Sequence, residues 1–192
     1  MKIARDARPL VVAIAGPNGA GKSTFFHSHL EEVGLPFVNA DVLALRLNLG
    51  AYAAAEMADA LRRQMVQQAQ SFVFETVFSD PVGDKVAFLE EAEAVGFQVV
   101  LCFIGISSAD VSDARVAMRV QRGGHNVPTG KIVERYPRTL QNLKRAIESL
   151  PDVRVFDNDD LRRPYRLVAR CERGRVTSLK EPVPAWLRKI LP

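Results

Sequence analysis

One short motif near the start of the chain constrains the fold more than any other segment. It has the pattern G-x-x-x-x-G-K-S and consists of Gly16, Pro17, Asn18, Gly19, Ala20, Gly21, Lys22 and Ser23. The apolar run 10–15 precedes it, and a helix-compatible stretch follows it. In this context the backbone N–H groups of the turn surround the β-phosphate of a nucleotide, and side chains at Gly16 and Gly21 would obstruct that turn. The motif therefore predicts a phosphate-binding loop and a nucleotide triphosphate as its ligand.

Two side chains of the motif add specific contacts to this loop. Lys22 is expected to reach the β- and γ-phosphate oxygens, and the Ser23 hydroxyl is expected to bind Mg²⁺. The N-terminus of the following helix directs partial positive charge toward the anion. We therefore expect ATP and Mg²⁺ as cofactors, with Thr24 among the nucleotide-binding residues.

The order of elements along the chain predicts the architecture around this loop. Apolar runs at 9–15, 36–39, 71–74, 97–106 and 153–156 alternate with helical patterns at 22–33, 41–69, 82–95, 108–122 and 129–150. Such alternation is typical of an α/β fold with a parallel sheet. We expect a P-loop NTPase-type three-layer fold with a mostly parallel five-stranded sheet. A small C-terminal β-hairpin is expected to turn at Arg173-Gly174.

Length and composition favour a single domain spanning residues 1–192, because 47% of the residues are hydrophobic and can form one core. The N-terminal segment includes Asp6 and shows no signal or transit pattern. No apolar run approaches the roughly 20 residues that a membrane-spanning helix needs. Cys102 and Cys171 follow no ligand pattern and are expected to be reduced thiols. These features predict a cytoplasmic protein without membrane contact.

Basic residues are concentrated in a C-terminal extension at about 161–192. This extension holds nine of the 26 Lys and Arg residues but only two of the 22 Asp and Glu residues, in a chain of net charge +4. The surplus is either a solvated face or a contact surface for an acidic protein, an anionic substrate or nucleic acid.

Ligands of parallel sheets bind beyond the carboxyl ends of the strands, so polar residues at these positions are candidate site residues. Asp41 follows the second strand and is either the N-cap of the next helix or the carboxylate that accepts the proton of a substrate hydroxyl. Glu75 and Thr76 end the third strand, where a charged side chain needs a partner. We expect them to contact a substrate hydroxyl or to take part in a contact linked to Mg²⁺, and an exposed strand end is the alternative. Asn158 follows the fifth strand and is expected at the nucleotide.

Three arginines form a second strong pattern. Arg115, Arg119 and Arg122 are four and three residues apart, so they share one face of a helix. Gly123-Gly124 then provide a flexible stop. The pattern favours a helical lid at about 108–130 that clamps the triphosphate, with Arg115 and Arg119 in catalysis and Arg122 at the nucleotide. A solvated face is the alternative, and His125 is either a lid contact or merely exposed.

The fourth strand, 97–106, does not end in an acidic residue, and the third strand supplies only Glu75. A mechanical or transport ATPase usually has an apolar strand that ends in aspartate. The absence of that signal favours a small-molecule kinase.

Together these blocks resemble the zeta toxin family of P-loop kinases, and in particular its short bacterial members. The resemblance extends from about residue 10 to 158. It is carried by the segments Gly16–Phe25, Phe37–Asp41, Phe74–Ser79, Arg115–Val120, Gly123–Pro128 and Arg135-Tyr136.

The resemblance implies ATP-dependent phosphorylation of a hydroxyl on a nucleotide sugar, UDP-N-acetylglucosamine, by a toxin that an antitoxin protein holds inactive. It implies that Asp41 deprotonates this hydroxyl and that Glu75 and Thr76 contact the substrate. It also implies that Lys22 is the phosphate lysine and that Arg115 is one of the arginines at the γ-phosphate. Where larger toxins have a further arginine in the lid, this chain has His125, with Arg119 and Arg122 as candidate replacements.

Two other interpretations stay open. The acceptor could be another metabolite or the hydroxyl of an antibiotic. The chain could also be a nucleotide-dependent binding or switch protein whose basic extension engages a partner or nucleic acid. Asp41 and Glu75 in the predicted crevice argue against this second class, so nucleic acid is not the expected partner.

Overall fold

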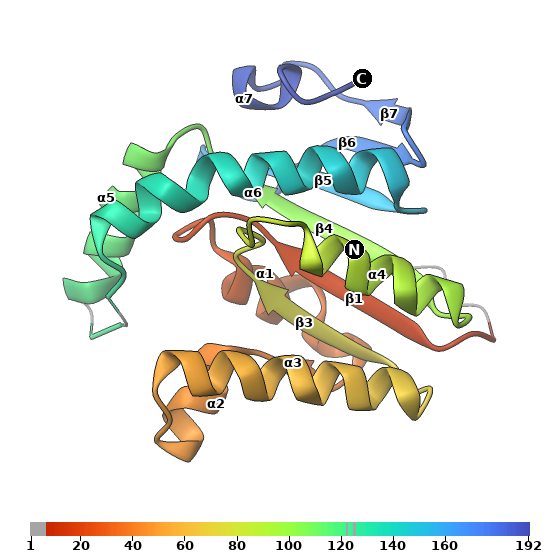
Figure 1. Ribbon diagram of the computed structural model, residues 1–192. Helices are drawn as coiled ribbons and strands as arrows, with labels where there is room; N and C mark the ends of the chain where they lie inside the picture. Colours follow the sequence, from red (N-terminus) through yellow and green to blue (C-terminus); the bar gives the residue numbers. More distant parts are fainter. Residues whose placement is uncertain (1–6, 122, 125) are drawn as a thin grey trace.

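The computed structural model describes residues 7–121, 123–124 and 126–192, and a seven-stranded sheet forms its centre (Figure 1). The strand order is β2-β3-β1-β4-β5-β6-β7. Neighbouring strands among the first five are parallel, and β6 and β7 continue the sheet in antiparallel fashion. The strands are β1 (Leu10–Ala15), β2 (Phe37–Val38), β3 (Phe72–Thr76), β4 (Gln98–Gly105), β5 (Val153–Asp157), β6 (Arg166–Glu172) and β7 (Arg175–Leu179).

The predicted α/β fold with a mostly parallel sheet is confirmed, but the strand count differs. The expected C-terminal hairpin is present as β6 and β7, and it turns at Arg173-Gly174, where both residues have positive φ. This hairpin is hydrogen-bonded to β5 and therefore extends the main sheet from five to seven strands. The physical reason is burial, because Val168, Ala169 and Cys171 of β6 pack into the same core as β5.

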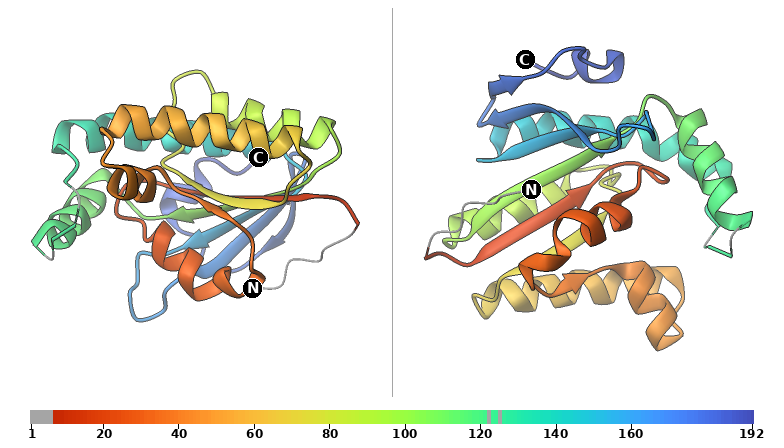
Figure 2. Two further views of the ribbon diagram at one scale, coloured as in Figure 1. Left: turned by 90° about the horizontal axis from the view of Figure 1, so that it is seen from below. Right: turned by 180° about the vertical axis from the view of Figure 1, so that it is seen from behind.

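Helices cover both faces of the sheet, as the left view of Figure 2 shows. One core lies under α3, α4, α6 and the C-terminal α7, and the opposite core lies under α1. The helices are α1 (Lys22–His29), α2 (Ala40–Leu47), α3 (Ala51–Gln67), α4 (Asp84–Ala94), α5 (Ala109–Gln121), α6 (Thr129–Ser149) and α7 (Ala185–Arg188), with a 3₁₀ turn at Glu31–Val33. Among the described residues, none of these helices is both long and apolar enough to cross a membrane.

The helical region predicted at 41–69 consists of two helices, α2 and α3. The break follows from the backbone of Asn48, which closes α2 in the left-handed region with φ of 50°. Asparagine tolerates this conformation better than most residues, and it commonly ends helices in this way. The turn places α2 beside α3, at the edge of the sheet next to β2 (Figure 1).

The predicted lid at about 108–130 corresponds to α5, the segment after it and the first residues of α6. In both figures α5 projects beyond the end of the sheet that carries the phosphate-binding loop. Two of the predicted lid contacts, Arg122 and His125, lie outside the described residues.

Candidate active site

The phosphate-binding loop follows β1, and its glycines are required by the surrounding backbone as well as by the turn. Gly16 has φ of 144°, and a Cβ atom there would lie 2.2 Å from the carbonyl oxygen of Ile104 in β4. Gly21 has φ of 91°, and a Cβ atom there would lie 2.9 Å from Asn158 Nδ2 and from the Tyr165 hydroxyl. No side chain fits at either position without displacing a neighbour.

Two residues from the segment after β5 support the loop from behind. Asn158 is buried, and its Nδ2 donates to the Ala20 carbonyl oxygen at 2.8 Å while its Oδ1 accepts from Tyr165 N at 3.2 Å. The Tyr165 hydroxyl donates to the Gly21 carbonyl oxygen at 2.9 Å. Asn158, which the sequence predicts at the nucleotide, therefore holds the loop through Nδ2 and holds Tyr165, the second support of the loop, through Oδ1.

A third support comes from α5, where the buried Ser112 hydroxyl donates to the Asn18 carbonyl oxygen at 2.6 Å. The Asn18 Oδ1 atom is itself buried and has no hydrogen-bond partner among the described residues. Ser112 and Tyr165 could not be predicted from the sequence, because they are 94 and 144 residues from their partners and belong to no motif.

Lys22 and Ser23 meet Glu75 at the carboxyl end of β3. The Ser23 hydroxyl donates to Glu75 Oε2 at 2.7 Å, and Lys22 Nζ lies 3.8 Å from Oε1. Lys22 Nζ also donates to the Pro17 carbonyl oxygen at 3.0 Å. Burial lowers the pKa of Lys22, while the charges of Glu75 and Asp41 act to raise it. Glu75 is therefore in direct contact with the two side chains that the sequence predicts at phosphate and Mg²⁺.

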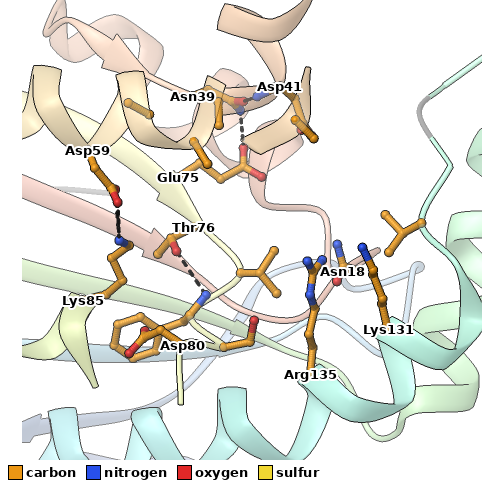
Figure 3. A pocket seen from close by; sticks show the side chains of 18 of the residues that line it. Asn18, Asn39, Asp41, Asp59, Glu75, Thr76, Asp80, Lys85, Lys131 and Arg135 are labelled. Atoms are coloured by element: carbon orange, nitrogen blue, oxygen red, sulfur yellow. Dashed lines mark hydrogen bonds and ion pairs between the residues drawn. The ribbon is translucent and has the colours of Figure 1, made fainter. Parts of the chain in front are cut away.

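Asp41 is the second residue of α2, and it is not the N-cap of that helix. The cap is Asn39, whose Oδ1 accepts from Asp41 N at 2.8 Å and from Val42 N at 3.2 Å. Asn39 Nδ2 donates to Glu75 Oε2 at 2.8 Å, as drawn in Figure 3. Of the two sequence interpretations for Asp41, capping is thus excluded. Its carboxylate, which forms no hydrogen bond or ion pair in the described part of the chain, remains available for chemistry.

A cavity of about 370 Å³ joins these residues in front of the loop. Asp41, Glu75, Thr76 and Arg119 all line it, so the structure brings together most of the predicted catalytic and substrate residues. The Thr76 side chain accepts from Phe78 N at 3.1 Å, which fixes the turn after β3. A second cavity of about 490 Å³ lies beside α2, with Asp41 and Arg119 again in its wall and Ser23 beside them.

The two described lid arginines point to different sides of the loop. Arg115 Nη2 donates to the Asp159 carbonyl oxygen at 2.9 Å, in the segment that follows β5. Arg119, one turn later, lines both cavities, and its charge acts to lower the pKa of Lys22. The arginine helix is present, but only Arg119 of these two lies on the side of Asp41 and Glu75.

Two cations of α6 complete the wall of the first cavity. Figure 3 shows the side chains of Lys131 and Arg135 extending from α6 toward Asn18. The Arg135 guanidinium has no hydrogen bond or ion pair within the described ranges, and Lys131 contacts the Tyr52 ring with its Nζ 5.7 Å from the ring centroid. Arg135 belongs to the Arg135-Tyr136 segment of the family resemblance, but no sequence pattern predicts a role for either residue, although their spacing of four places them on one face of the helix.

The far end of this cavity holds a partly buried charge cluster that belongs to no sequence motif. Lys85 Nζ lies 3.0 Å from both carboxylate oxygens of Asp59, which also pairs with Arg62. Arg62 is buried, its guanidinium lies 4.9 Å from the centroid of the Phe74 ring, and burial lowers its pKa to about 10. This end of the cavity is therefore polar, with one carboxylate shared by two cations.

Comparison with known proteins gives an independent view of these residues. The model of the family described as zeta toxin matches residues 49–167. This match begins after the phosphate-binding loop and Asp41, so it does not depend on either of them. An uncharacterized protein of Haemophilus influenzae is 29% identical over 126 residues, which are 63% of this chain and 88% of that protein.

Two solved structures share the fold. The chain from the AvrRxo1-ORF1:-ORF2 complex with ATP is 18% identical, with a TM-score of 0.63 over 96% of this chain and 64% of that one. The chain from the PezAT chromosomal toxin-antitoxin system of Streptococcus pneumoniae is 17% identical, with a TM-score of 0.61 over 85% of this chain and 72% of that one. This chain thus spans less than two thirds of the AvrRxo1 chain, and identities this low show the fold alone.

Proposed function

The chain belongs to the zeta toxin family, and from this premise we propose that it is a phosphotransferase that moves the γ-phosphate of ATP to a hydroxyl of a small molecule. The observation that carries the proposal is the meeting of three elements around Glu75. Lys22 and Ser23 of the motif contact Glu75 of β3, and Glu75 lines a cavity together with Asp41 of α2, whose carboxylate forms no hydrogen bond or ion pair with the residues that the structure describes. A site that only hydrolysed ATP would not need a second carboxylate facing a cavity of about 370 Å³.

The residues present fit a nucleotide and a divalent cation. The loop is a cradle in which Gly16 and Gly21 leave no room for a side chain, and the buried Lys22 places a positive charge inside it. Ser23 would supply a hydroxyl ligand to Mg²⁺, with Glu75 behind that hydroxyl. Mg²⁺ in such a site draws charge from the phosphate oxygens during transfer.

Asp41 would act as the general base. Its carboxylate accepts the proton of the acceptor hydroxyl, the hydroxyl oxygen bonds to the γ-phosphorus, and the bond from that phosphorus to the β,γ-bridging oxygen breaks. ADP leaves with the bridging oxygen, and the proton remains on Asp41 until it passes to solvent. Lys22 is held by the Pro17 carbonyl oxygen and lies near Glu75, where it would contact the phosphates.

Cations from two helices would neutralise the charge that develops on the transferred group. Arg119 approaches from α5, and Arg135 with Lys131 approaches from α6. Arginine is suited to this task because its guanidinium can form two parallel hydrogen bonds to phosphate oxygens. Arg115 is bound to the Asp159 carbonyl oxygen, so we assign it to the nucleotide side of the loop rather than to the γ-phosphate.

Our preferred acceptor is a nucleotide sugar, UDP-N-acetylglucosamine, which follows from the family resemblance. The polar lining of the cavity, with Asp59 and Lys85 at one end and Arg135 at the other, suits an acceptor that carries hydroxyls and an anionic group. By the same resemblance the protein would be the toxin of a toxin-antitoxin pair, and the PezAT structure is of such a system.

Several basic residues of the C-terminal extension form ion pairs within the fold. Arg166 pairs with Asp157, Arg173 with Glu93 and Arg188 with Glu181. These ion pairs support a structural role for part of the excess positive charge, and they leave fewer basic side chains to contact nucleic acid. We therefore keep a small-molecule acceptor as the proposal.

Product identification tests the proposal most directly. The protein is incubated with Mg²⁺, ATP labelled at the γ-phosphate and a set of acceptors that includes UDP-N-acetylglucosamine, sugars and hydroxylated antibiotics. Mass spectrometry then identifies the labelled product. Transfer to one acceptor at a rate well above release of inorganic phosphate is the expected result. Release of inorganic phosphate alone, with every acceptor and with a metabolite extract, would contradict the proposal.

A further inference from the structure

Helix α2, which carries Asp41, is weakly anchored to the rest of the fold. Its sequence is mostly apolar, yet none of its eight residues is buried. Ala40 and Leu43 pack partly against the core, whereas Val42, Leu45 and Leu47 are exposed. Tertiary packing supplies most of the stability of a short helix, so a helix with this little burial depends strongly on how its ends are held.

The N-terminal end of α2 is held by one amide side chain. Asn39 is only 6% exposed, and both ends of its amide are used. Oδ1 accepts from Asp41 N and Val42 N, which caps the helix, and Nδ2 donates to Glu75 Oε2 at 2.8 Å. The same side chain therefore caps α2 and ties it to the end of β3.

The Glu75 oxygen that accepts the hydrogen bond from Asn39 also accepts one from Ser23 of the phosphate-binding motif. Glu75 Oε2 accepts from the Ser23 hydroxyl at 2.7 Å, and Lys22 lies near the other carboxylate oxygen. A continuous set of hydrogen bonds thus runs from Ser23 through Glu75 and Asn39 to the backbone of Asp41. It connects the hydroxyl predicted at Mg²⁺ with the residue proposed as general base.

We infer that Asn39 is a positioning residue that couples occupation of the nucleotide site to the placement of Asp41. The inference rests on the proposed function, because that function gives Ser23, Lys22 and Asp41 their roles. When nucleotide binds, Lys22 turns from Glu75 to phosphate, whereas Ser23 binds the metal through its oxygen and keeps its proton directed at Glu75 Oε2. The Glu75 charge is then no longer offset by Lys22, so its charge-assisted hydrogen bond from Asn39 Nδ2 strengthens. The first turn of α2 is therefore held more firmly once nucleotide is bound.

Amide hydrogen exchange of α2 tests this coupling without any acceptor. The exchange of the Asp41 and Val42 amides is measured by NMR with and without Mg²⁺ and a non-hydrolysable ATP analogue. In the unmodified protein we expect the analogue to slow exchange at these two amides by about fivefold or more. The variant Asn39→Ser keeps a capping oxygen but is too short to maintain the contact with Glu75. In Asn39→Ser the slowing is expected to disappear, while the analogue still binds with an affinity weakened by no more than the same factor.

Asn48→Ala is the matched control, because it loosens the same helix from its other end. Asn48 has φ of 50°, which alanine tolerates poorly, but the contact between Asn39 and Glu75 is untouched. This variant should exchange faster in both states and still show the nucleotide-dependent slowing. The inference is overturned if the analogue does not slow exchange at Asp41 and Val42 in the unmodified protein. It is also overturned if Asn39→Ser retains the effect.

The exchange experiment and the proposed function can fail separately. Hydrogen exchange is measured on α2 in the complex with the ATP analogue, so its result remains valid even where no acceptor is phosphorylated. With an identified acceptor, Asn39→Ser should lower kcat by about tenfold while the KM for ATP changes little, because a misplaced base affects the transfer step. An unchanged kcat would contradict the positioning role even where Asp41 proves to be the base.

Discussion

The Ser23 hydroxyl donates a hydrogen bond of 2.7 Å to Glu75, which joins the phosphate-binding loop to the end of β3. Strand β1, which leads into the loop, and β3, which carries Glu75, are adjacent and parallel, with Ile14 of β1 in register with Glu75. The carboxyl ends of β1 and β3 therefore meet at one point of the sheet. Glu75 lies where it can orient Ser23 and offset the charge of Lys22, in addition to its predicted contact with substrate.

Glu75→Gln tests this arrangement through the pH dependence of activity. Burial lowers the pKa of Lys22, and the charge of Glu75 is the largest influence that raises it. Because Lys22 must be protonated to bind phosphate, activity is lost as pH rises through the pKa of Lys22 in the folded protein. Removing the charge of Glu75 lowers this pKa further, so the alkaline limb of the kcat/KM profile should move to lower pH. Glu56→Gln on the exposed side of α3 is the control, and an alkaline limb that does not move would contradict the role of Glu75.

Asp41→Asn separates catalysis from nucleotide binding. Asn39 is the N-cap of α2, so the change removes the proposed base without removing the cap. We expect kcat to fall by about 10²-fold to 10⁴-fold, since this is the usual contribution of a general base. The dissociation constant for ATP, measured by calorimetry, should change little. Turnover equal to that of the unmodified protein would exclude Asp41 as the base.

Asp41 and Glu75 also show how much of the site can be predicted from the sequence. Spacing alone predicts that Asp41 and Glu75 lie near the loop, because all three follow neighbouring parallel strands. Spacing does not reveal that Asn39 rather than Asp41 caps α2, since both residues are good caps and the choice depends on the contact of Asn39 with Glu75. Local patterns identify candidates, and tertiary contacts divide the roles among them.

The same limit explains what the sequence missed in the fold. The hairpin of β6 and β7 was expected from its turn residues, but its attachment to β5 depends on which face of β6 is buried. The charge cluster of Asp59, Arg62 and Lys85 joins α3 to α4 across 26 residues and follows no motif. These three residues come into contact only when both helices lie on the same face of the sheet.

Tyr165→Phe tests the support of the loop from behind. The hydroxyl donates to the Gly21 carbonyl oxygen at 2.9 Å, and phenylalanine keeps the ring contact with Phe25 while removing this bond. A single neutral hydrogen bond contributes about 0.5–1.5 kcal/mol, so ATP affinity should fall by about threefold to tenfold. Tyr52→Phe on the exposed part of α3 is the control. An ATP affinity equal to that of the control would show that the loop keeps its conformation without Tyr165.

Gly105→Ala tests the packing of the C-terminal segment. A Cβ atom at Gly105 would lie 2.1 Å from the buried Trp186 ring, so α7 must shift away from β4. Overpacking of this kind costs about 1–3 kcal/mol, and the free energy of unfolding in urea should fall by that amount. The smaller ring in Trp186→Phe should relieve the clash, so the double variant should be more stable than the sum of the two single effects. Strict additivity would indicate that α7 does not press on Gly105.

Arg119 and Arg115 offer a matched pair on one helix, since the structure places them on different sides of the loop. Arg119 lines the cavity with Asp41, whereas Arg115 donates to the Asp159 carbonyl oxygen. We expect Arg119→Ala to lower kcat by about 10²-fold or more, because a lid arginine stabilises charge on the transferred phosphoryl group. Arg115→Ala should mainly raise the KM for ATP, because it frees the segment after β5 that supports the loop through Asn158 and Tyr165. Steady-state kinetics with varied ATP separate the two effects. A larger loss of kcat in Arg115→Ala than in Arg119→Ala would reverse the assignment and restore the role that the family resemblance implies for Arg115.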